Sequence, residues 1–165
     1  MAALLQECSS KAKSASQNRF QAVTDHIATL GPSAIDVSLS NLCSGMHDLE
    51  EGLPLLHLAS SWLLEACQSR ERYEAVNAYL HRFLHLHANV IAGIDASIKR
   101  ESLDDDEDEE VVEEQRRQKE LQTSKREELL ECVASLRKAQ KESSEALEGK
   151  MQNTLCLLRH FSRMV

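Results

Sequence analysis

Two histidines at helical spacing are the first residues in the chain that could do chemistry. His81 and His85 would share one face of a helix, where a pair of imidazoles can hold a metal ion. The H-E-x-x-H pattern is absent because Arg82 follows His81, and the stretch HRFLHLH contains no acidic residue to complete a site. We therefore interpret the pair as a polar helix edge, with His87 partly buried, and expect neither a metal nor another cofactor.

The cysteines are the second candidates. Cys67 or Cys156 could act as a nucleophile, but nothing in the sequence brings a thiol, an imidazole and an orienting carboxylate together. Glycine-rich phosphate-binding motifs and the G-x-S-x-G elbow are also absent. The sequence therefore predicts no enzyme and no small-molecule substrate. The five cysteines are widely spaced without a C-x-x-C, which is typical of buried thiols in a reducing compartment: Cys8, Cys43, Cys67, Cys132 and Cys156.

The composition indicates one helical domain. The chain has 165 residues and 18.5 kDa, with 5 glycines, 2 prolines and 4% aromatic residues. So few turn formers and aromatics argue against an all-β fold, and the abundant Leu, Ala, Glu, Gln, Lys and Arg residues favour helix. No apolar run approaches the roughly 18 residues that cross a bilayer. We expect a soluble, intracellular, single helical domain over residues 1–165.

Most of the negative charge lies in one segment. The net charge is −8, but residues 101–114 hold ten acids and no base, which leaves 17 acids and 19 bases elsewhere. Neither part has the clustered lysines and arginines of a nucleic-acid surface. A calcium loop would need spaced aspartates and a turn glycine, which are missing. We interpret residues 100–112 as a solvated, disordered loop, and the alternatives are a shield against RNA or a site for basic protein tails.

The apolar spacing predicts an irregular all-α bundle of about five helices. Residues 1–16 are expected to form a short or frayed helix and a linker, and their abrupt start leaves open that the chain is a piece of a longer protein. The next helix ends at residues 31–32, where a glycine and a proline cannot continue it. A short helix follows, with a capping-box-like pair of Ser33 and Asp36 at its start and Gly45 at its end.

The fourth predicted helix is expected to be the central one. The third begins near Leu53, with Pro54 in its first turn, and Ser69 is expected to cap the fourth. The fourth helix is apolar on two sides, so it should pack against two neighbours. Its main stripe alternates spacings of three and four residues: Tyr73, Val76, Leu80, Phe83, His87, Val90 and Ile94. A second stripe comprises Tyr79, Leu84, Leu86 and Ile91.

The last predicted helix is too long for the domain. It begins near Val112 and would run roughly 60 Å at the usual helical rise. One small domain cannot cover that length, so either the helix breaks near residues 143–149 or part of its apolar stripe meets another chain. We hypothesise that this stripe binds a partner through Leu129, Val133, Leu136, Leu147, Met151, Leu158 and Phe161.

Two stretches resemble a known family. Residues 30–39, LGPSAIDVSL, and residues 71–91, ERYEAVNAYLHRFLHLHANVI, are similar to the C-terminal helical domain of a WD-repeat ribosome-assembly family. The shared pattern is Pro-Ser-x-Ile-Asp, followed later by Tyr-Leu-x-x-Phe-Leu-x-Leu-His. The closing stretch NTLCLLRHFSRMV is also similar to the ending of the family. The family is that of the U-three-protein twenty-one, also called WD-repeat protein thirty-six.

The resemblance implies a role in assembly. In the family, this domain follows two WD-repeat propellers, which are absent here, and belongs to a scaffold subunit of the UTP-B subcomplex. That subcomplex is part of the small-subunit processome, which processes pre-18S rRNA in the nucleolus of the nucleus. The implied partners are other UTP-B subunits, held through their C-terminal helical domains, with pre-rRNA and the U-three small nucleolar RNP contacted indirectly. The implied function is a protein-protein assembly module without membrane contact, and the alternative is direct binding of pre-rRNA.

Overall fold

The computed structural model describes residues 1–11, 19–101 and 113–162, and within these ranges it contains helices and turns and no strand. The predicted all-α class is therefore confirmed. The acidic loop predicted over residues 100–112 lies, from residue 102 onward, outside the described residues, as do residues 12–18 of the N-terminal linker region. The elements in chain order are α1 (Ala2–Lys11), α2 (Gln21–Ala28), α3 (Pro32–Ser40), the 3-10 turn η1 (Met46–Asp48), α4 (Leu49–Ser69), α5 (Tyr73–Glu101) and α6 (Glu113–Ser162).

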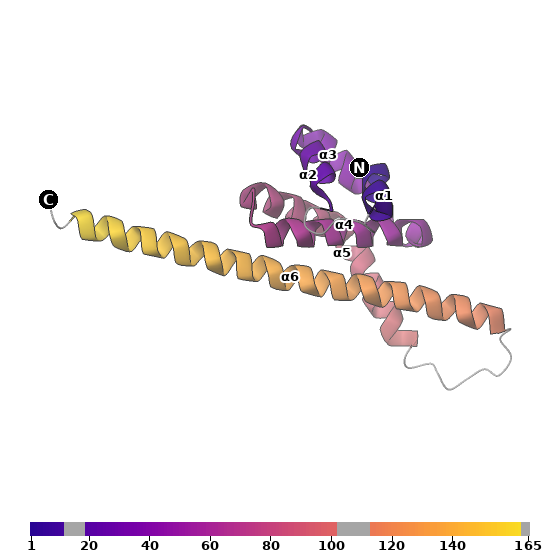
Figure 1. The fold of residues 1–165 in the computed structure, drawn as a ribbon. Coiled ribbons are helices and arrows are strands. Elements are labelled where there is room, and N and C mark those ends of the chain that lie inside the picture. Colours follow the sequence, from indigo (N-terminus) through magenta and orange to yellow (C-terminus); the bar gives the residue numbers. More distant parts are fainter. Residues whose placement is uncertain (12–18, 102–112, 163–165) are drawn as a thin grey trace.

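Helix α4, and not α5, is the central element. It contacts α1, η1, α5 and α6, whereas α5 contacts α3, α4 and α6 (Figure 1). The prediction that α5 is central was wrong, because it rested on the positions of large apolar residues alone. On α4, small residues such as Gly52, Ala59 and Ser60 are buried as well and admit neighbours on further sides. The main stripe predicted for α5 is confirmed, since it is buried from Val76 to Ile94.

Helices α4 and α6 run side by side in the same direction. Near the start of α4, Gln122 donates a hydrogen bond to Glu50 over 2.9 Å. Near its end, the Ser143 hydroxyl donates to the carbonyl oxygen of Cys67 over 3.0 Å. From the first contact to the second, the residue numbers increase in both helices, so the two helices are parallel. Helix α4 ends at Ser69, but α6 continues without a break to the end of its range, and Figure 1 shows its C-terminal part projecting past the other helices.

Three predicted helix starts were wrong. Helix α4 begins at Leu49 and not near Leu53, so Pro54 lies inside the helix and not in its first turn. Helix α3 begins at Pro32 with Gly31 before it, and no side chain caps it. The Asp36 carboxylate instead accepts two hydrogen bonds from the Arg82 guanidinium, over 2.6 and 2.9 Å, and so ties α3 to α5. Ser69 does not cap α5 but is the last residue of α4. A capping pattern in the sequence describes only neighbouring residues of one helix. In this structure the carboxylate of Asp36 pairs with Arg82 of another helix.

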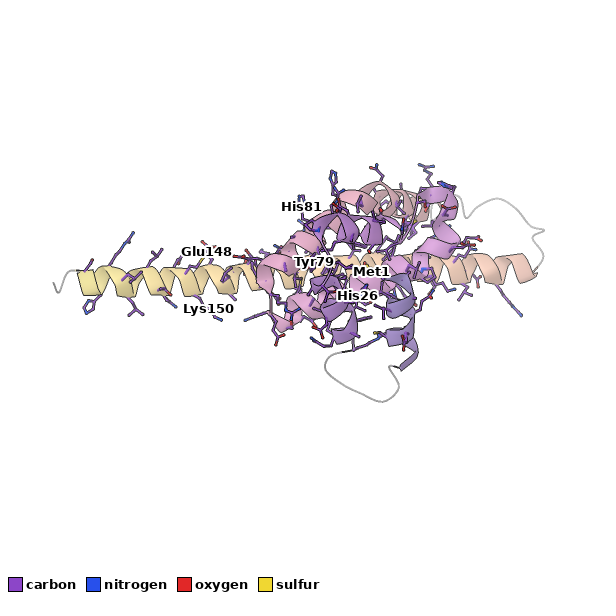
Figure 2. All side chains as sticks on the ribbon, turned by 90° about the horizontal axis from the view of Figure 1, so that it is seen from above. Met1, His26, Tyr79, His81, Glu148 and Lys150 are labelled. Atoms are coloured by element: carbon purple, nitrogen blue, oxygen red, sulfur yellow. The ribbon has the colours of Figure 1, made fainter. Side chains whose placement is uncertain are left out.

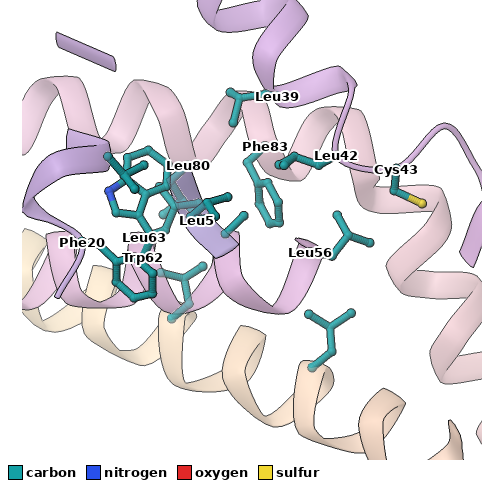
Figure 3. Close-up of a cluster of buried hydrophobic side chains, with 14 of the residues drawn as sticks. Leu5, Phe20, Leu39, Leu42, Cys43, Leu56, Trp62, Leu63, Leu80 and Phe83 are labelled. Atoms are coloured by element: carbon teal, nitrogen blue, oxygen red, sulfur yellow. The ribbon is translucent and has the colours of Figure 1, made fainter. Parts of the chain in front are cut away.

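The hydrophobic core lies around α4 and includes the N-terminal helix. Leu5 of α1 is fully buried and belongs to the same cluster as Trp62, Leu56 and Phe83 (Figure 3). The predicted short N-terminal helix therefore contributes to the core. The Trp62 indole donates a hydrogen bond to the Thr24 hydroxyl over 2.9 Å, which gives this buried ring a polar partner.

Close backbone packing at Gly52 gives a test of the α4 environment. A Cβ added there would lie 2.6 Å from the sulfur and 2.8 Å from the Cβ of Cys43. We expect Gly52→Ala to lower the free energy of unfolding by about 1–3 kcal/mol, as overpacking does. The measurement is urea unfolding followed by circular dichroism. Gly149→Ala is the control: nothing lies within 4 Å of its added Cβ, so it should not lower stability, and an equal loss in both variants would contradict the packing at Gly52.

Candidate partner-binding surface

The C-terminal part of α6 has no neighbour in the described chain that buries it. The last hydrogen bond between α6 and α4 joins Ser143 to Cys67, two residues before α4 ends. Residues 147–160 and 162 are all exposed. We call residues 147–162 the overhang. Figure 2, seen from above, shows it beyond the body of the domain, with Glu148 and Lys150 labelled on it.

The overhang carries one apolar stripe. Its members are the exposed side chains of Leu147, Met151, Leu155 and Leu158, with exposed fractions from 39% to 60%. At 100° per residue they fall within an arc of about 80° of the helix. The arc adjoins the side on which Leu136 packs against the body. We call these four residues the overhang stripe; it continues the core-facing side of α6 beyond the core. Leu157 is also exposed but lies on one flank.

The structure divides the seven residues of the sequence hypothesis. Leu129 and Leu136 lie in the core of this chain and offer no surface to a partner. Val133 is half-buried and packs against the same core. Leu147, Met151 and Leu158 are exposed on the overhang. The side chain of Phe161 lies outside the described residues.

Sequence reasoning missed Leu155. Its signal was present, since it follows Met151 by four residues and so lies near it on the helix. A strict alternation of three and four residues from Met151 to Leu158 passes through Thr154, which is polar, and so skips Leu155.

The overhang is close to electrically neutral. Its described charged residues are Glu148, Lys150 and Arg159, and its last described turn also holds His160. The Glu148 carboxylate accepts a hydrogen bond from Gln152 over 3.3 Å along the helix surface. The side chains around the stripe therefore form neither a basic patch nor an acidic one.

His81, His85 and the cysteines do not form a reactive centre in the described part of the chain. The His81 and His85 rings stack on the exposed side of α5 with centroids 6.4 Å apart. No cluster of three or more His, Cys, Asp or Glu side chains suited to a metal occurs among the described residues. Burial raises the pKa of the Cys67 thiol, and it also raises that of Cys132, against a smaller lowering by the Ser61 hydrogen bond. A raised pKa leaves less thiolate, so neither thiol is activated.

A hollow of about 40 Å³ lies between α2, the end of α4 and the start of α5, lined in part by Trp62, Glu65 and Arg72. Pockets for small-molecule ligands usually measure about 300–1,000 Å³. This hollow is large enough for water only.

His87 is a structural group on α5. Only 1% of it is exposed, and its Nε2 lies 3.0 Å from the carbonyl oxygen of Leu39. A carbonyl oxygen only accepts, so Nε2 carries the proton and joins α5 to α3. Within the described residues Nδ1 is buried without a hydrogen-bond partner. Burial lowers the pKa of His87, and the Leu39 hydrogen bond opposes this more weakly.

The lowered pKa of His87 predicts a loss of stability in acid. In the unfolded chain the imidazole takes up a proton below about pH 6.5, whereas the folded protein resists it. The unfolded state therefore binds more protons in that window, and the free energy of unfolding should fall as the pH drops below about 6.5. Urea unfolding at several pH values measures this. His87→Gln should show a shallower decline between pH 7.5 and 5, and an unchanged decline would contradict the assignment.

An all-α domain with a long C-terminal helix is the class of protein that these features define. The family model described as the Utp21-specific WD40-associated putative domain matches residues 2–162. The chain belongs to this Utp21 family, and the resemblance seen in the sequence is confirmed. Utp21 proteins are WD-repeat proteins of ribosome biogenesis in the nucleus and are not enzymes.

Neither the curated proteins nor the solved structures gave a significant match to the chain. Among the helices in the described ranges, none has the length and apolar character needed to cross a membrane.

Proposed function

We propose that the chain is a protein-protein assembly module of a ribosome-biogenesis scaffold. The scaffold is the UTP-B subcomplex of the small-subunit processome, which acts in pre-18S rRNA processing in the nucleolus. Its partners are other UTP-B subunits, bound through their C-terminal helical domains, while pre-rRNA and the U-three small nucleolar RNP are contacted indirectly. The observation that carries this proposal is the overhang stripe, four large apolar side chains exposed along one side of an anchored helix.

Anchoring by α4 makes the overhang a suitable docking element. A free helix of about 15 residues is marginal in water, because its first turn is costly to form. Here the preceding part of α6 is already held in the core by Leu129, Leu136 and the Ser143 hydrogen bond. The overhang extends a formed helix, so a partner does not have to pay the entropy of nucleating it.

Burial of the stripe supplies the driving force. Covering one large apolar side chain contributes about 1.5–3 kcal/mol when it passes from full exposure to full burial. Leu158 and Met151 are the most exposed members, at 60% and 58%. A partner helix that lays its own apolar side along the stripe would bury these two together with their neighbours, which is the usual mode of helix recognition.

The charges favour a protein partner over RNA. Binding of RNA or DNA relies on several lysines and arginines that neutralise phosphates, often with aromatic side chains that stack on bases. The overhang offers Lys150 and Arg159 as bases, with Glu148 between them and the body. Direct binding of pre-rRNA is the alternative function, and this charge distribution does not favour it.

Acidic substitutions in the stripe test the proposal. Leu158→Asp should abolish co-purification of UTP-B subunits, because it places a charge in the apolar contact, while the circular dichroism spectrum stays unchanged. Cys156→Asp is the matched control, since Cys156 is exposed on the opposite side of the same helix, and it should leave co-purification intact. Co-purification that survives Leu158→Asp and Met151→Asp would contradict the proposed surface.

Leu136→Asp separates a fold defect from a binding defect. Leu136 is only 1% exposed, so a charge there should unfold the domain rather than affect partner binding alone. This variant should lose its cooperative thermal transition, in contrast to Leu158→Asp.

A gel-shift assay addresses the alternative. With RNA of the 5′ external transcribed spacer at physiological salt, the overhang should support no tight complex, because its described lysines and arginines are Lys150 and Arg159 alone. Tight binding that weakens steeply as salt is raised would support direct recognition of pre-rRNA instead.

A further inference from the structure

We propose that the occupant of the overhang stripe is one amphipathic helix of a partner subunit, which lies antiparallel to α6 and ends at Arg70 and Tyr73. This inference rests on the proposed function, because it needs the stripe to bind a protein. It goes further in giving the secondary structure, the length and the direction of the segment that binds.

The overhang stripe continues an interface between two helices. Helix α6 packs on α4 as far as Ser143, whose hydroxyl donates to the carbonyl oxygen of Cys67 over 3.0 Å. Beyond this contact, side chains at intervals of four, four and three residues keep to one side of α6: Leu147, Met151, Leu155 and Leu158. A row of large side chains at this spacing is the surface that one helix presents to another. The segment that extends this packing is a single helix on the side where α4 ends.

The turn between α4 and α5 limits how far that helix can reach. Arg70 takes a left-handed conformation (φ 56°), and α5 begins at Tyr73. Both residues line a narrow crevice beside α6 together with Gln140 and Ser143. A helix that approaches from the tip of α6 therefore meets the body at this crevice and ends there. The overhang is about 24 Å long, which is the length of a helix of about 16 residues.

The crevice offers hydrogen-bond donors that lack acceptors. The Arg70 guanidinium can only donate, and the Tyr73 hydroxyl can donate as well. Neither side chain has a hydrogen-bond or ion-pair partner among the residues that the structure describes. The Cys67 carbonyl, at the end of α4, already accepts the Ser143 hydroxyl. The crevice therefore suits a group that brings acceptors and negative charge.

These donors select the C-terminal end of the partner helix. The last carbonyl groups of a helix have no partners within it and carry a partial negative charge, whereas its first N–H groups are unpaired donors with a partial positive charge. An N-terminal end would place donors against donors beside the Arg70 guanidinium. The partner helix therefore runs from the tip of α6 toward the body. The other charged residues of the turn, Glu71 and Arg72, line the hollow beside α2 instead.

Photo-crosslinking in the purified UTP-B subcomplex tests the length and the direction. Ser144 and Ser162 are exposed at the two ends of the stripe, on the same side of α6 and about five helical turns apart. Each is replaced in turn by photoreactive benzoylphenylalanine, and the crosslinked partner residues are identified by mass spectrometry. Cys156, on the opposite side of the helix, is the control position and should not reach the same segment.

The order of the crosslinks decides the direction. Both serine positions should reach one helix of one subunit, and the residues reached from Ser144 should follow those reached from Ser162 by about 12–18 residues in the partner sequence. The reverse order would mean a parallel helix. That result, crosslinks to two separate segments, or no crosslink from either serine position would each overturn the inference.

Charge reversal tests the role of Arg70. Arg70→Glu should raise the dissociation constant of the chain for a UTP-B subcomplex that lacks this subunit about threefold to tenfold, because it repels the carbonyl end of the partner helix. Arg72→Glu is the matched control. Arg72 lies in the same turn with a similar φ (50°), and its guanidinium lies 3.7 Å from the Asp25 carboxylate, so this variant should bind like the unmodified chain. Biolayer interferometry measures both constants. An Arg70→Glu variant that binds as tightly as the unmodified chain or tighter, or an equal loss in both variants, would overturn the proposed end contact.

The two proposals fail in different ways. Crosslinks in the reverse order, together with co-purification that Leu158→Asp abolishes, would reject the antiparallel helix and keep the proposed function. Co-purification that survives Leu158→Asp and Met151→Asp would reject the proposed partner surface itself.

Discussion

The parallel packing of α6 on α4 is the constraint on which the rest of the structure depends. It joins the start of α4, through the Gln122–Glu50 hydrogen bond, to its end, through Ser143 and the Cys67 carbonyl. Between these points Leu129, Leu136 and Ala139 are buried. Because the two helices run in the same direction and α4 is the shorter, everything in α6 after this contact projects from the body (Figure 1). The packing thus both builds the core and creates the overhang.

Helix α6 has two parts, one buried against α4 and one exposed as the overhang. The buried half is chosen for packing and includes small residues where the two helices meet. The exposed half keeps large apolar residues on the continuation of the same side, with few charges around them. Large apolar groups that water reaches, on a helix already formed, are typical of protein-protein contacts.

Helix class and apolar stripes could be predicted from the sequence, because periodicity reports which side of a helix is buried. It does not report what buries that side. Leu136 and Leu158 belong to one stripe, yet one is covered by α4 and the other is exposed, and the difference is the length of α4, which is a tertiary fact. Asp36 shows the same limit: its local pattern fits a helix cap, but Arg82 of another helix takes its carboxylate. The central place of α4 was also missed, because glycine and serine positions carry no apolar signal.

Hydrogen exchange measured on the chain alone and within the assembled UTP-B subcomplex tests the central claim most directly. Amides of the α6 segment held by α4 should be protected in both states, since that segment is core. Amides of the overhang should exchange quickly in the dilute free chain and become protected upon assembly. Overhang amides that exchange equally fast in both states would contradict the account, because the stripe would then remain uncovered in the complex it is proposed to hold together.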